Sequence, residues 1–346
     1  MAILGIRGGG ADGIPNMMFT QDTTYTPVKT LQAYVYVIGG GASGGYAGNW
    51  NTAASAGHSG GGGGAGGCAV SLLKLTAGVA YTADIGAGGA RVGTGAYAGD
   101  DFARGNAGVD TTFNGSDIDI MTGGGAPQGA DNTNGANLTT ASNGGSASGG
   151  NLMNNTGGKG KAVGAIKSVT GGGAVGLWGT GNDSTTVSAA SSEIADGANL
   201  TGAPHNKAAG TLDENGQGWG FVTGAPFPDI YAVTSSYHRS GGNWDESAGS
   251  TADVDVNPQA IKAGVQPYNY RAESVRWEDN ARSNPAPPFS GGVGMWNSTH
   301  PTVHAGMGTL GGGGGGCASF GPGTNSTGRS GMGGHGAVLI FPISMG

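Results

Sequence analysis

Six consecutive glycines at residues 311–316 constrain this chain more than any other feature of its sequence. Glycine has no side chain to bury and loses more conformational freedom on folding than other residues, so a run of it gains nothing from side-chain packing in a helix or strand. Glycine fills 78 of the 346 positions, and further tracts lie at 39–41, 60–67, 123–125 and 171–173. A folded form of this chain must therefore use backbone where other proteins use side chains.

The polyproline-II conformation is the best candidate for the glycine tracts. It has three residues per turn, rises about 3.1 Å per residue and makes no internal hydrogen bonds, so every N–H and C=O needs an outside partner. Neighbouring backbones can supply those partners, and they can approach closely only where no Cβ intervenes. The tracts therefore predict a bundle of polyglycine-II helices in which backbone packs directly on backbone.

Short alternating strands flank the tracts. In LQAYVYVI (31–38) alternate side chains face opposite sides, with Ala33, Val35 and Val37 on one face. We interpret residues 68–85 as a hairpin that turns at Thr76-Ala77-Gly78, and 111–125 as two more short strands. GAVLIFPI (336–343) is nearly all apolar and is expected in the core. The predicted fold class is all-β, with short antiparallel strands in a sandwich-like arrangement beside the polyglycine-II bundle.

The composition changes along the chain and suggests three parts. Residues 1–30 form an N-terminal attachment segment. Residues 31–125 together with 306–346 form the glycine-rich framework, and residues 126–305 form a long, loop-rich insertion that holds five of the six tryptophans. No clean linker separates the insertion from the framework.

Charge and hydropathy exclude two classes of partner. Charged residues make up 11% of the chain, the formal net charge is −7, and the 15 Lys and Arg form no basic cluster in the sequence. Nucleic-acid binding is therefore not expected. No apolar run approaches the roughly 20 residues of a membrane span, so membrane insertion is not expected either. A surface of Ser, Thr, Asn and Gly favours neutral polar partners.

Cys68 and Cys317 are the only cysteines, and both follow a glycine run, in GGGGGAGGCAV and LGGGGGGCASF. A disulfide between two neighbouring strand starts is one interpretation. The alternative, two small buried thiols, is favoured because free cysteine is commonly buried.

The sequence motifs that could indicate catalysis, metal binding or nucleotide binding lack the spacing or the secondary structure that each function requires. No G-x-G-x-x-G follows a strand and opens a helix, and GGKGKAVGAIKS (157–168) lacks the phosphate-loop spacing. Pro301 between His300 and His304 argues against a helical metal pair. Adjacent carboxylates such as Asp213 and Glu214 point in opposite directions in extended chain, and no G-x-S-x-G elbow occurs. We expect no enzymatic activity, no metal and no cofactor.

Aromatic residues interleaved with Arg, Asn, Ser and Asp gather in the insertion. Aromatic rings beside neutral hydrogen-bonding groups suit sugar faces and protein surfaces, and they are enriched at binding hot spots. The alternative is that they form the small core of an insertion that otherwise lacks Leu and Ile. The candidate receptor-binding residues are Trp219, Tyr231, Tyr237, Trp244, Tyr268, Tyr270, Trp277 and Trp296.

Taken in order, four segments resemble the glycine-rich domain of bacteriophage tail-fibre and adhesin proteins. They are the strand and tract AYVYVIGGGASGG, the segment GGGGGAGGCAVSLLKLTAGVAYTADIGAGG, the strand DTTFNGSDIDIMTGGGAPQG and the final GMGGHGAVLIFP. Together they cover roughly half of the chain. The resemblance implies a virion fibre or spike component on the extracellular side of the particle, commonly a homotrimer.

The chain departs from that family in two ways. Only about thirty residues precede the domain, whereas the family usually carries it at the end of a longer fibre, so attachment would depend on another virion fibre or tail protein. The insertion is also long, and it is expected to face the receptor. The predicted function is non-catalytic, multivalent binding to a host surface glycan or outer-membrane protein. The alternative is a purely structural self-assembling fibre or capsid decoration protein.

Overall fold

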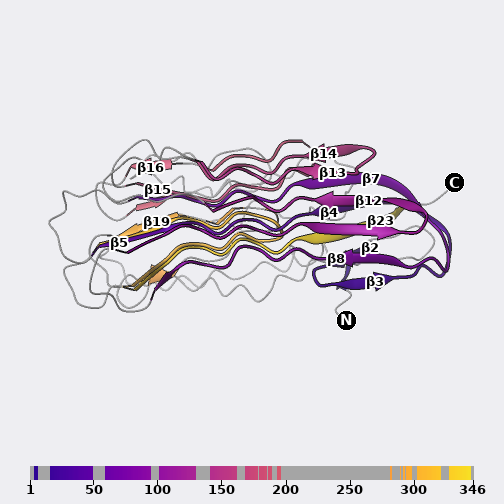
Figure 1. Cartoon of the computed structure of the whole chain (residues 1–346), viewed down its shortest axis with the longest axis horizontal. Coiled ribbons are helices and arrows are strands. Elements are labelled where there is room, and N and C mark those ends of the chain that lie inside the picture. The colour runs from indigo at the N-terminus through magenta and orange to yellow at the C-terminus, as the bar shows by residue number, and fades with distance from the viewer. Residues whose placement is uncertain are drawn as a thin grey trace, which may run out of the picture.

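The computed structural model describes residues 4–6, 16–49, 59–94, 101–129, 141–161, 168–177, 179–184, 186–188, 193–195, 281–282, 289, 291–292, 294–297, 302–320 and 327–343. All regular secondary structure in these ranges is β, and none of them contains a helix. Strands lie at the two ends of an elongated molecule, and extended glycine tracts run between them (Figure 1). The all-β prediction is therefore confirmed for the described residues.

A six-stranded antiparallel sheet lies at one end, which we call the sandwich end. Its central strand is the apolar C-terminal segment, whose residues are buried as predicted except for the partly exposed Ile343. The strand order is β1 (Leu4–Ile6), β2 (Asn16–Phe19), β23 (Ala337–Ile343), β4 (Leu31–Ile38), β7 (Cys68–Leu75) and β14 (Met153–Asn155).

A five-stranded antiparallel sheet packs against the first. The two strands predicted within 111–125 are present and pair with each other, with a register shift between Phe113 and Gly115. The strand order is β13 (Ala147–Ser148), β12 (Ile118–Gly123), β11 (Thr111–Gly115), β8 (Tyr81–Asp84) and β3 (Thr23–Tyr25).

The prediction that residues 68–85 form a hairpin is wrong. Both strands exist, but β7 pairs with β4 and β14 in the first sheet, whereas β8 pairs with β11 and β3 in the second. Both edges of β7 are thus occupied by other strands, and the turn carries the chain from one sheet to the other. The Tyr81 hydroxyl fixes this crossing by accepting from the Thr76 N–H at 2.7 Å and donating to Asp117 at 3.0 Å.

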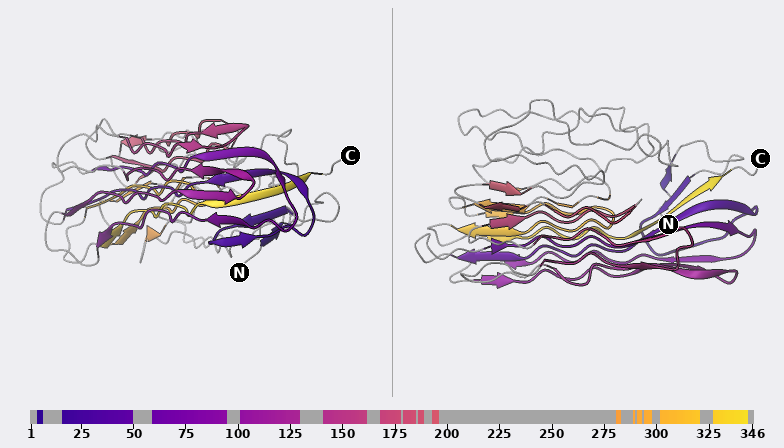
Figure 2. Two further views of the ribbon diagram at one scale, coloured as in Figure 1. Left: turned by 45° about the vertical axis from the view of Figure 1, so that its right-hand side comes forward. Right: turned by 90° about the horizontal axis from the view of Figure 1, so that it is seen from above.

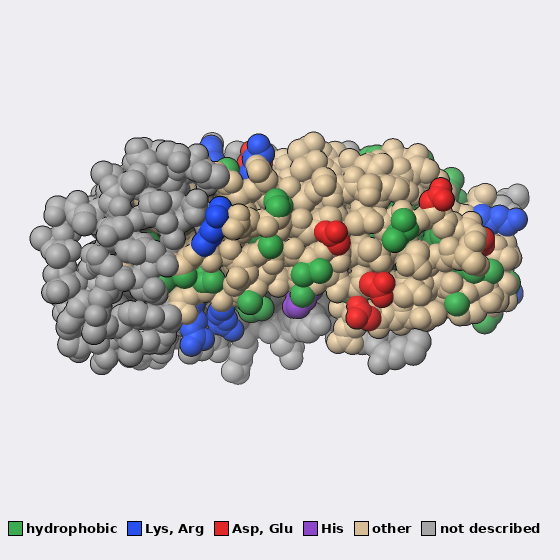
Figure 3. Space-filling view, viewed as in Figure 1, with side chains coloured by type: hydrophobic (Ala, Val, Ile, Leu, Met, Phe, Trp, Pro, Cys, Tyr) green, Lys and Arg blue, Asp and Glu red, His purple; other side chains and the backbone are tan. Residues whose placement is uncertain are grey.

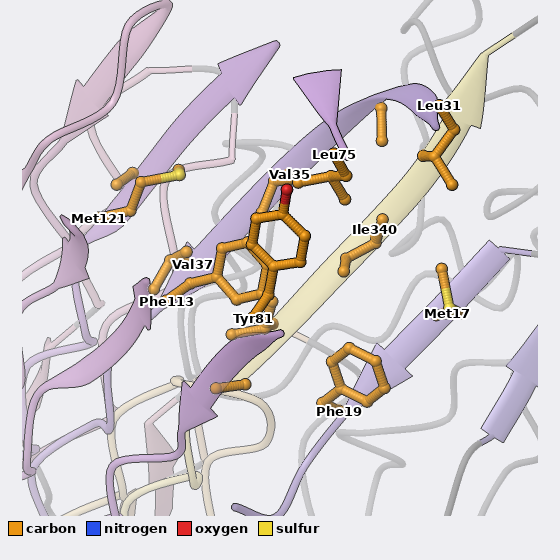
Figure 4. Close-up of a cluster of buried hydrophobic side chains, with 14 residues drawn as sticks. Met17, Phe19, Leu31, Val35, Val37, Leu75, Tyr81, Phe113, Met121 and Ile340 are labelled. Atoms are coloured by element: carbon orange, nitrogen blue, oxygen red, sulfur yellow. The ribbon is translucent and has the colours of Figure 1, made fainter. Parts of the chain in front are cut away.

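The main hydrophobic core fills the space between these two sheets (Figure 4). The first sheet contributes Val35, Val37 and Ile340, and the second contributes a stacked pair, Tyr81 and Phe113, with ring centroids 5.8 Å apart. The opposite face of β4 packs into a second cluster. The predicted division of 31–38 into two faces is therefore confirmed, and each face contributes buried residues, although Tyr34 is only partly buried.

Three small sheets form the other end of the molecule, the distal end (Figures 1 and 2). Their strands include parallel pairs such as β5 with β21. Tyr46, Ala305 and Cys317 make a small core there. The sheets are β10 (Asp101–Ala103), β5 (Tyr46–Asn49), β21 (Cys317–Phe320), β19 (Gly294–Asn297) and β17 (Glu193–Ala195); β18 (Ala281–Arg282), β20 (Thr302–His304), β22 (Thr327–Arg329) and β9 (Gly93–Thr94); and β16 (Thr186–Ser188), β15 (Ser168–Thr170) and β6 (Ser59–Gly60).

Candidate functional site: the glycine array

Extended tracts that lie almost wholly outside the strands connect the two ends, and we call them together the glycine array. They lie side by side in both views of Figure 2. Each tract leaves or enters a strand of the sandwich or distal end, so the array sets the separation of the two ends. Its main tracts are residues 39–45, 61–67, 86–90, 105–109, 123–126, 142–146, 156–160, 170–175, 305–309, 311–316 and 330–336.

The backbone N–H groups of tract 39–45 return to the same neighbour every third residue. Residues 39, 42 and 45 donate to the carbonyls of residues 67, 64 and 61 at 3.0, 2.9 and 2.8 Å. Residues 40 and 43 donate to 109 and 106, and residues 41 and 44 donate to 334 and 331. Each acceptor series descends in steps of three, so the three neighbouring tracts run antiparallel to this one. The donors therefore point in three directions around the tract.

The six-glycine run shows the same period with a different set of neighbours. Every N–H from Gly312 to Cys317 donates to a backbone carbonyl at 2.9–3.0 Å. The acceptors are residues 309, 173, 42, 306, 170 and 45, so three tracts are each met twice, three residues apart. The carbonyls of the run accept from residues 66 and 63, from 334 and 331, and from 292. Six surrounding segments thus satisfy the polar backbone of one buried tract.

The interior of the array has no room for a Cβ atom. A Cβ built on Gly41 or Gly313 lies within 3.0 Å of the backbone of the neighbouring tract, which real Cβ atoms essentially never do. The same holds for Gly44, Gly172, Gly314 and Gly316. Gly179 is different, because a Cβ there meets nothing within 4 Å. Close backbone approach, and not flexibility, therefore requires glycine in the interior tracts.

Tracts on the outside of the array carry a side chain at every third position. Ala87 and Ala90 are exposed and flank Gly88-Gly89, of which Gly89 is buried. Asn143 and Ser146 are likewise exposed on either side of Gly144-Gly145. The pattern x-G-G-x therefore marks an outer tract and an uninterrupted glycine run marks an inner one. The sequence analysis treated all tracts alike and missed this signal.

Buried hydroxyl groups serve N–H donors where no backbone carbonyl is available. Ser43 accepts from the Asn106 N–H at 2.7 Å, and Thr111 accepts from the Gly86 N–H at 2.9 Å. Ser142 and Thr170 do the same for two residues of tract 61–67, at 2.8 and 2.6 Å. Because an unpaired buried N–H costs about 1–3 kcal/mol, these four side chains are part of the array and not surface groups.

Cys68 and Cys317 are buried and no disulfide joins them, as the favoured interpretation predicted. Each begins a strand, Cys68 in β7 at the sandwich end and Cys317 in β21 at the distal end, so the matching sequence contexts lead to opposite ends of the array (Figure 1). Burial raises the pKa of the Cys68 thiol well above its ordinary value. Burial also raises the pKa of Cys317, to about 12, although hydrogen bonds from the backbone of Arg329 and Ala305 act in the opposite direction.

The raised pKa values of the two thiols predict that the folded chain loses stability at alkaline pH. Their folded-state pKa values lie above the ordinary 9.0, so the stabilisation is fully present below pH 9 and falls as pH rises, because unfolded thiols ionise and buried ones do not. Denaturant unfolding between pH 8 and 10.5 should give a smaller decrease in unfolding free energy for the double variant Cys68→Ala, Cys317→Ala than for the unsubstituted chain. Tyr25 and Tyr81, whose pKa values burial also raises, are common to both proteins. Identical pH slopes would contradict this assignment.

Of the eight candidate receptor-binding residues, the structure places one. The backbone of Trp296 lies in β19, between β17 and β21, at the distal end. Trp219, Tyr231, Tyr237, Trp244, Tyr268, Tyr270 and Trp277 lie outside the described residues. His304 lies in β20, and His300 falls outside the described ranges.

No protein-family model and no curated protein matches this chain. Within the part of the chain that the structure describes, no helix is long and apolar enough to cross a membrane. The same residues contain no group of three His, Cys, Asp or Glu side chains positioned to hold a metal ion.

Proposed function

We propose that the tracts of the glycine array are polyglycine-II helices. Three features support this proposal: the return of hydrogen bonds to the same neighbour every third residue, the six segments around residues 311–317, and the exposure of every third residue in the outer tracts. A pleated strand would instead alternate between two directions with a period of two. The array is then a rigid rod of hydrogen-bonded backbone.

We further propose that the chain is a structural component of a bacteriophage tail fibre or spike that binds a host surface receptor without catalysis. The observation that carries this proposal is the two-ended architecture. Residues 196–280, which hold seven of the eight candidate aromatic residues, join the described chain at β17 and at β18. β17 pairs with β19 and β18 with β20, both at the distal end. The array thus holds these attachment points away from the sandwich, and in our proposal the sandwich joins another virion protein.

Cell adsorption tests the proposed function. The fluorescently labelled full chain is incubated with a panel of bacterial strains and the retained label is measured by cytometry. We expect retention on some strains, and about tenfold weaker retention for the double variant Trp244→Ala, Trp277→Ala, because buried Trp residues dominate binding at hot spots. Trp178→Ala is the matched control, since Trp178 is outside the candidate set.

Each outcome of the adsorption test has a distinct meaning. Equal loss in the control and the double variant would contradict the assignment of the aromatic residues. Absence of adsorption to every strain, together with long polymers in the purified sample, would contradict the adhesin and support a self-assembling structural fibre. We also propose, from the resemblance to tail-fibre proteins, that the chain forms a homotrimer, so sedimentation of the same sample should give about three times the chain mass of 33.5 kDa.

A further inference from the structure

The fold gathers three arginines that are far apart in the sequence. Arg91 precedes β9, Arg104 follows β10, and Arg329 ends β22. Arg329 is the β-sheet partner of Gly93, and Val92 and Ser330 exchange two hydrogen bonds, at 3.0 and 2.8 Å. Arg91 and Arg329 therefore lie on directly bonded segments.

The third arginine, Arg104, lies on a segment that is hydrogen-bonded to the segment carrying Arg91. The Asn106 side-chain amide donates to the Ala90 carbonyl at 2.9 Å, which joins the segment carrying Arg104 to the one carrying Arg91. The Nε atom of Arg104 donates to the Gly129 carbonyl at 3.4 Å, so one donor of that side chain is used within the chain. We call Arg91, Arg104 and Arg329 the arginine patch.

The patch is exposed and stands on rigid backbone. All three side chains are exposed, whereas the neighbouring Ser330 is buried and bonded to Val92. The backbone of Arg329 also hydrogen-bonds the buried Cys317 thiol, and the Ala305 N–H donates to the Arg329 carbonyl at 3.0 Å. The backbone segments that carry the three arginines are therefore held in place by the array.

Two acidic residues on the same segments lie at the other end of the molecule, whereas Asp101 in β10 lies three residues from Arg104. Asp84 belongs to β8 and Asp110 directly precedes β11, so both lie at the sandwich end. In Figure 3 several basic side chains lie toward the distal end with one acidic side chain among them, most acidic side chains lie over the middle and the sandwich end, and further basic side chains lie at the sandwich end. The distal end of a chain with a formal net charge of −7 thus carries three exposed arginines.

We propose that the arginine patch binds the carboxylate or phosphate groups of an acidic cell-surface polysaccharide. Guanidinium groups match both anions in bidentate geometry, and a row of them on a stiff scaffold suits repeated anionic groups along a polymer. A nucleic acid is the less favoured polyanion, because the patch has three cations where duplex binding typically uses six to ten phosphate contacts. This inference rests on the proposed adhesin and narrows its receptor to an acidic glycan.

Binding to purified polysaccharides tests the inference without cells. The full chain is passed over immobilised alginate, a carboxylated polymer; teichoic acid, a phosphate polymer; neutral dextran; and random-sequence duplex DNA, at 50 and 300 mM salt. We expect binding to one or both acidic polysaccharides, no binding to dextran, and weaker binding at 300 mM salt because ions screen exposed charges. The alginate and teichoic acid arms distinguish the carboxylate from the phosphate.

A pair of variants with equal charge change makes the test specific. Arg91→Gln, Arg329→Gln should weaken acidic-polysaccharide binding about tenfold. Lys29→Gln, Lys74→Gln removes the same charge at the sandwich end, where both side chains are exposed, and should leave binding within about twofold. Both double variants should keep the circular dichroism spectrum of the unsubstituted chain.

Three results of the polysaccharide assay would overturn the inference: no binding to either acidic polymer at 50 mM salt, equal weakening by both double variants, or binding to DNA alone. Cell adsorption that persists unchanged in Arg91→Gln, Arg329→Gln would reject the patch and leave the adhesin proposal standing. Polysaccharide binding without adsorption to any strain would reject the adhesin proposal instead.

Discussion

Gly313→Ala is expected to lower the free energy of unfolding by roughly 3 kcal/mol or more. The added Cβ would lie within 3.0 Å of the carbonyls of Gly63 and Gly64, both of which are backbone atoms and cannot rotate away. Overpacking a dense interior typically costs about 1–3 kcal/mol. Displacing the tract also weakens the bond from Gly313 to Gly173 at 3.0 Å, and each lost hydrogen bond costs about 1 kcal/mol.

Gly179→Ala is the matched control, because a Cβ there meets nothing within 4 Å. The control makes the same chemical change and should alter stability by less than about 1 kcal/mol, since Gly→Ala at a compatible backbone position is neutral or mildly stabilising. Chemical denaturation of both variants measures the difference. Equal stability of Gly313→Ala and Gly179→Ala would show that the six-glycine run is not packed against its neighbours.

Phe113→Ala is expected to cost about 3–5 kcal/mol, as large aromatic truncations in cores do. Phe113 is fully buried and stacks on Tyr81 across neighbouring strands of the second sheet. Ile120→Ala on the adjacent strand β12 is the control, because its side chain is 55% exposed and should contribute little. An equal loss in the two variants would contradict the assignment of this core.

The same variant tests whether the two ends unfold together. The array bonds the sandwich to the distal end through many backbone hydrogen bonds, so a loss of stability in the sandwich should appear at both cysteines. In Phe113→Ala, a thiol reagent is expected to modify Cys68 and Cys317 with equally increased rates, because both thiols are buried in the folded chain. Faster modification of Cys68 alone would mean that the sandwich opens while the distal end stays folded.

Local sequence patterns predicted the strands of the sandwich but not their pairing. The alternation in 31–38 located β4 and both of its faces, and the apolar run at 336–343 located β23. The turn at Thr76-Ala77-Gly78 was equally visible, yet the arms beside it joined different sheets. Turn residues report a change of direction. They do not indicate which strands will pair with each other. Here β7 pairs with β4 along its whole length instead of with β8.

The sequence indicated that the glycine runs pack closely, but it did not indicate which runs lie next to one another. Long glycine runs indicate close backbone packing, but a residue without a side chain carries no information about which neighbour it meets. The donor from Gly66 to Gly311 and the one from Gly292 to Gly313 join segments that no local pattern connects. The buried Ser142 and Thr170 acceptors were missed for the same reason, because only the assembled array shows which N–H groups lack a backbone carbonyl.

The arginine patch also depends on assembly. Arg91, Arg104 and Arg329 are isolated in the sequence, and the absence of a basic run there argued only against a contiguous cluster. Pairing of β9 with β22 brings Arg91 and Arg329 together. By contrast, the candidate aromatic residues were chosen from composition alone, and apart from the backbone of Trp296 they lie outside the described residues. Their role in binding stays a prediction.

Amide hydrogen exchange tests the central claim most directly, because the claim concerns backbone N–H groups that have no side chains to report on them. The measurement follows peptides covering residues 39–45 and 311–317, with an unstructured glycine-rich peptide as the reference. If neighbouring main chains satisfy these donors, both glycine peptides will exchange as slowly as the core strands β4 and β23, through global unfolding. Exchange at the rate of unstructured glycine peptides in either tract would contradict the account.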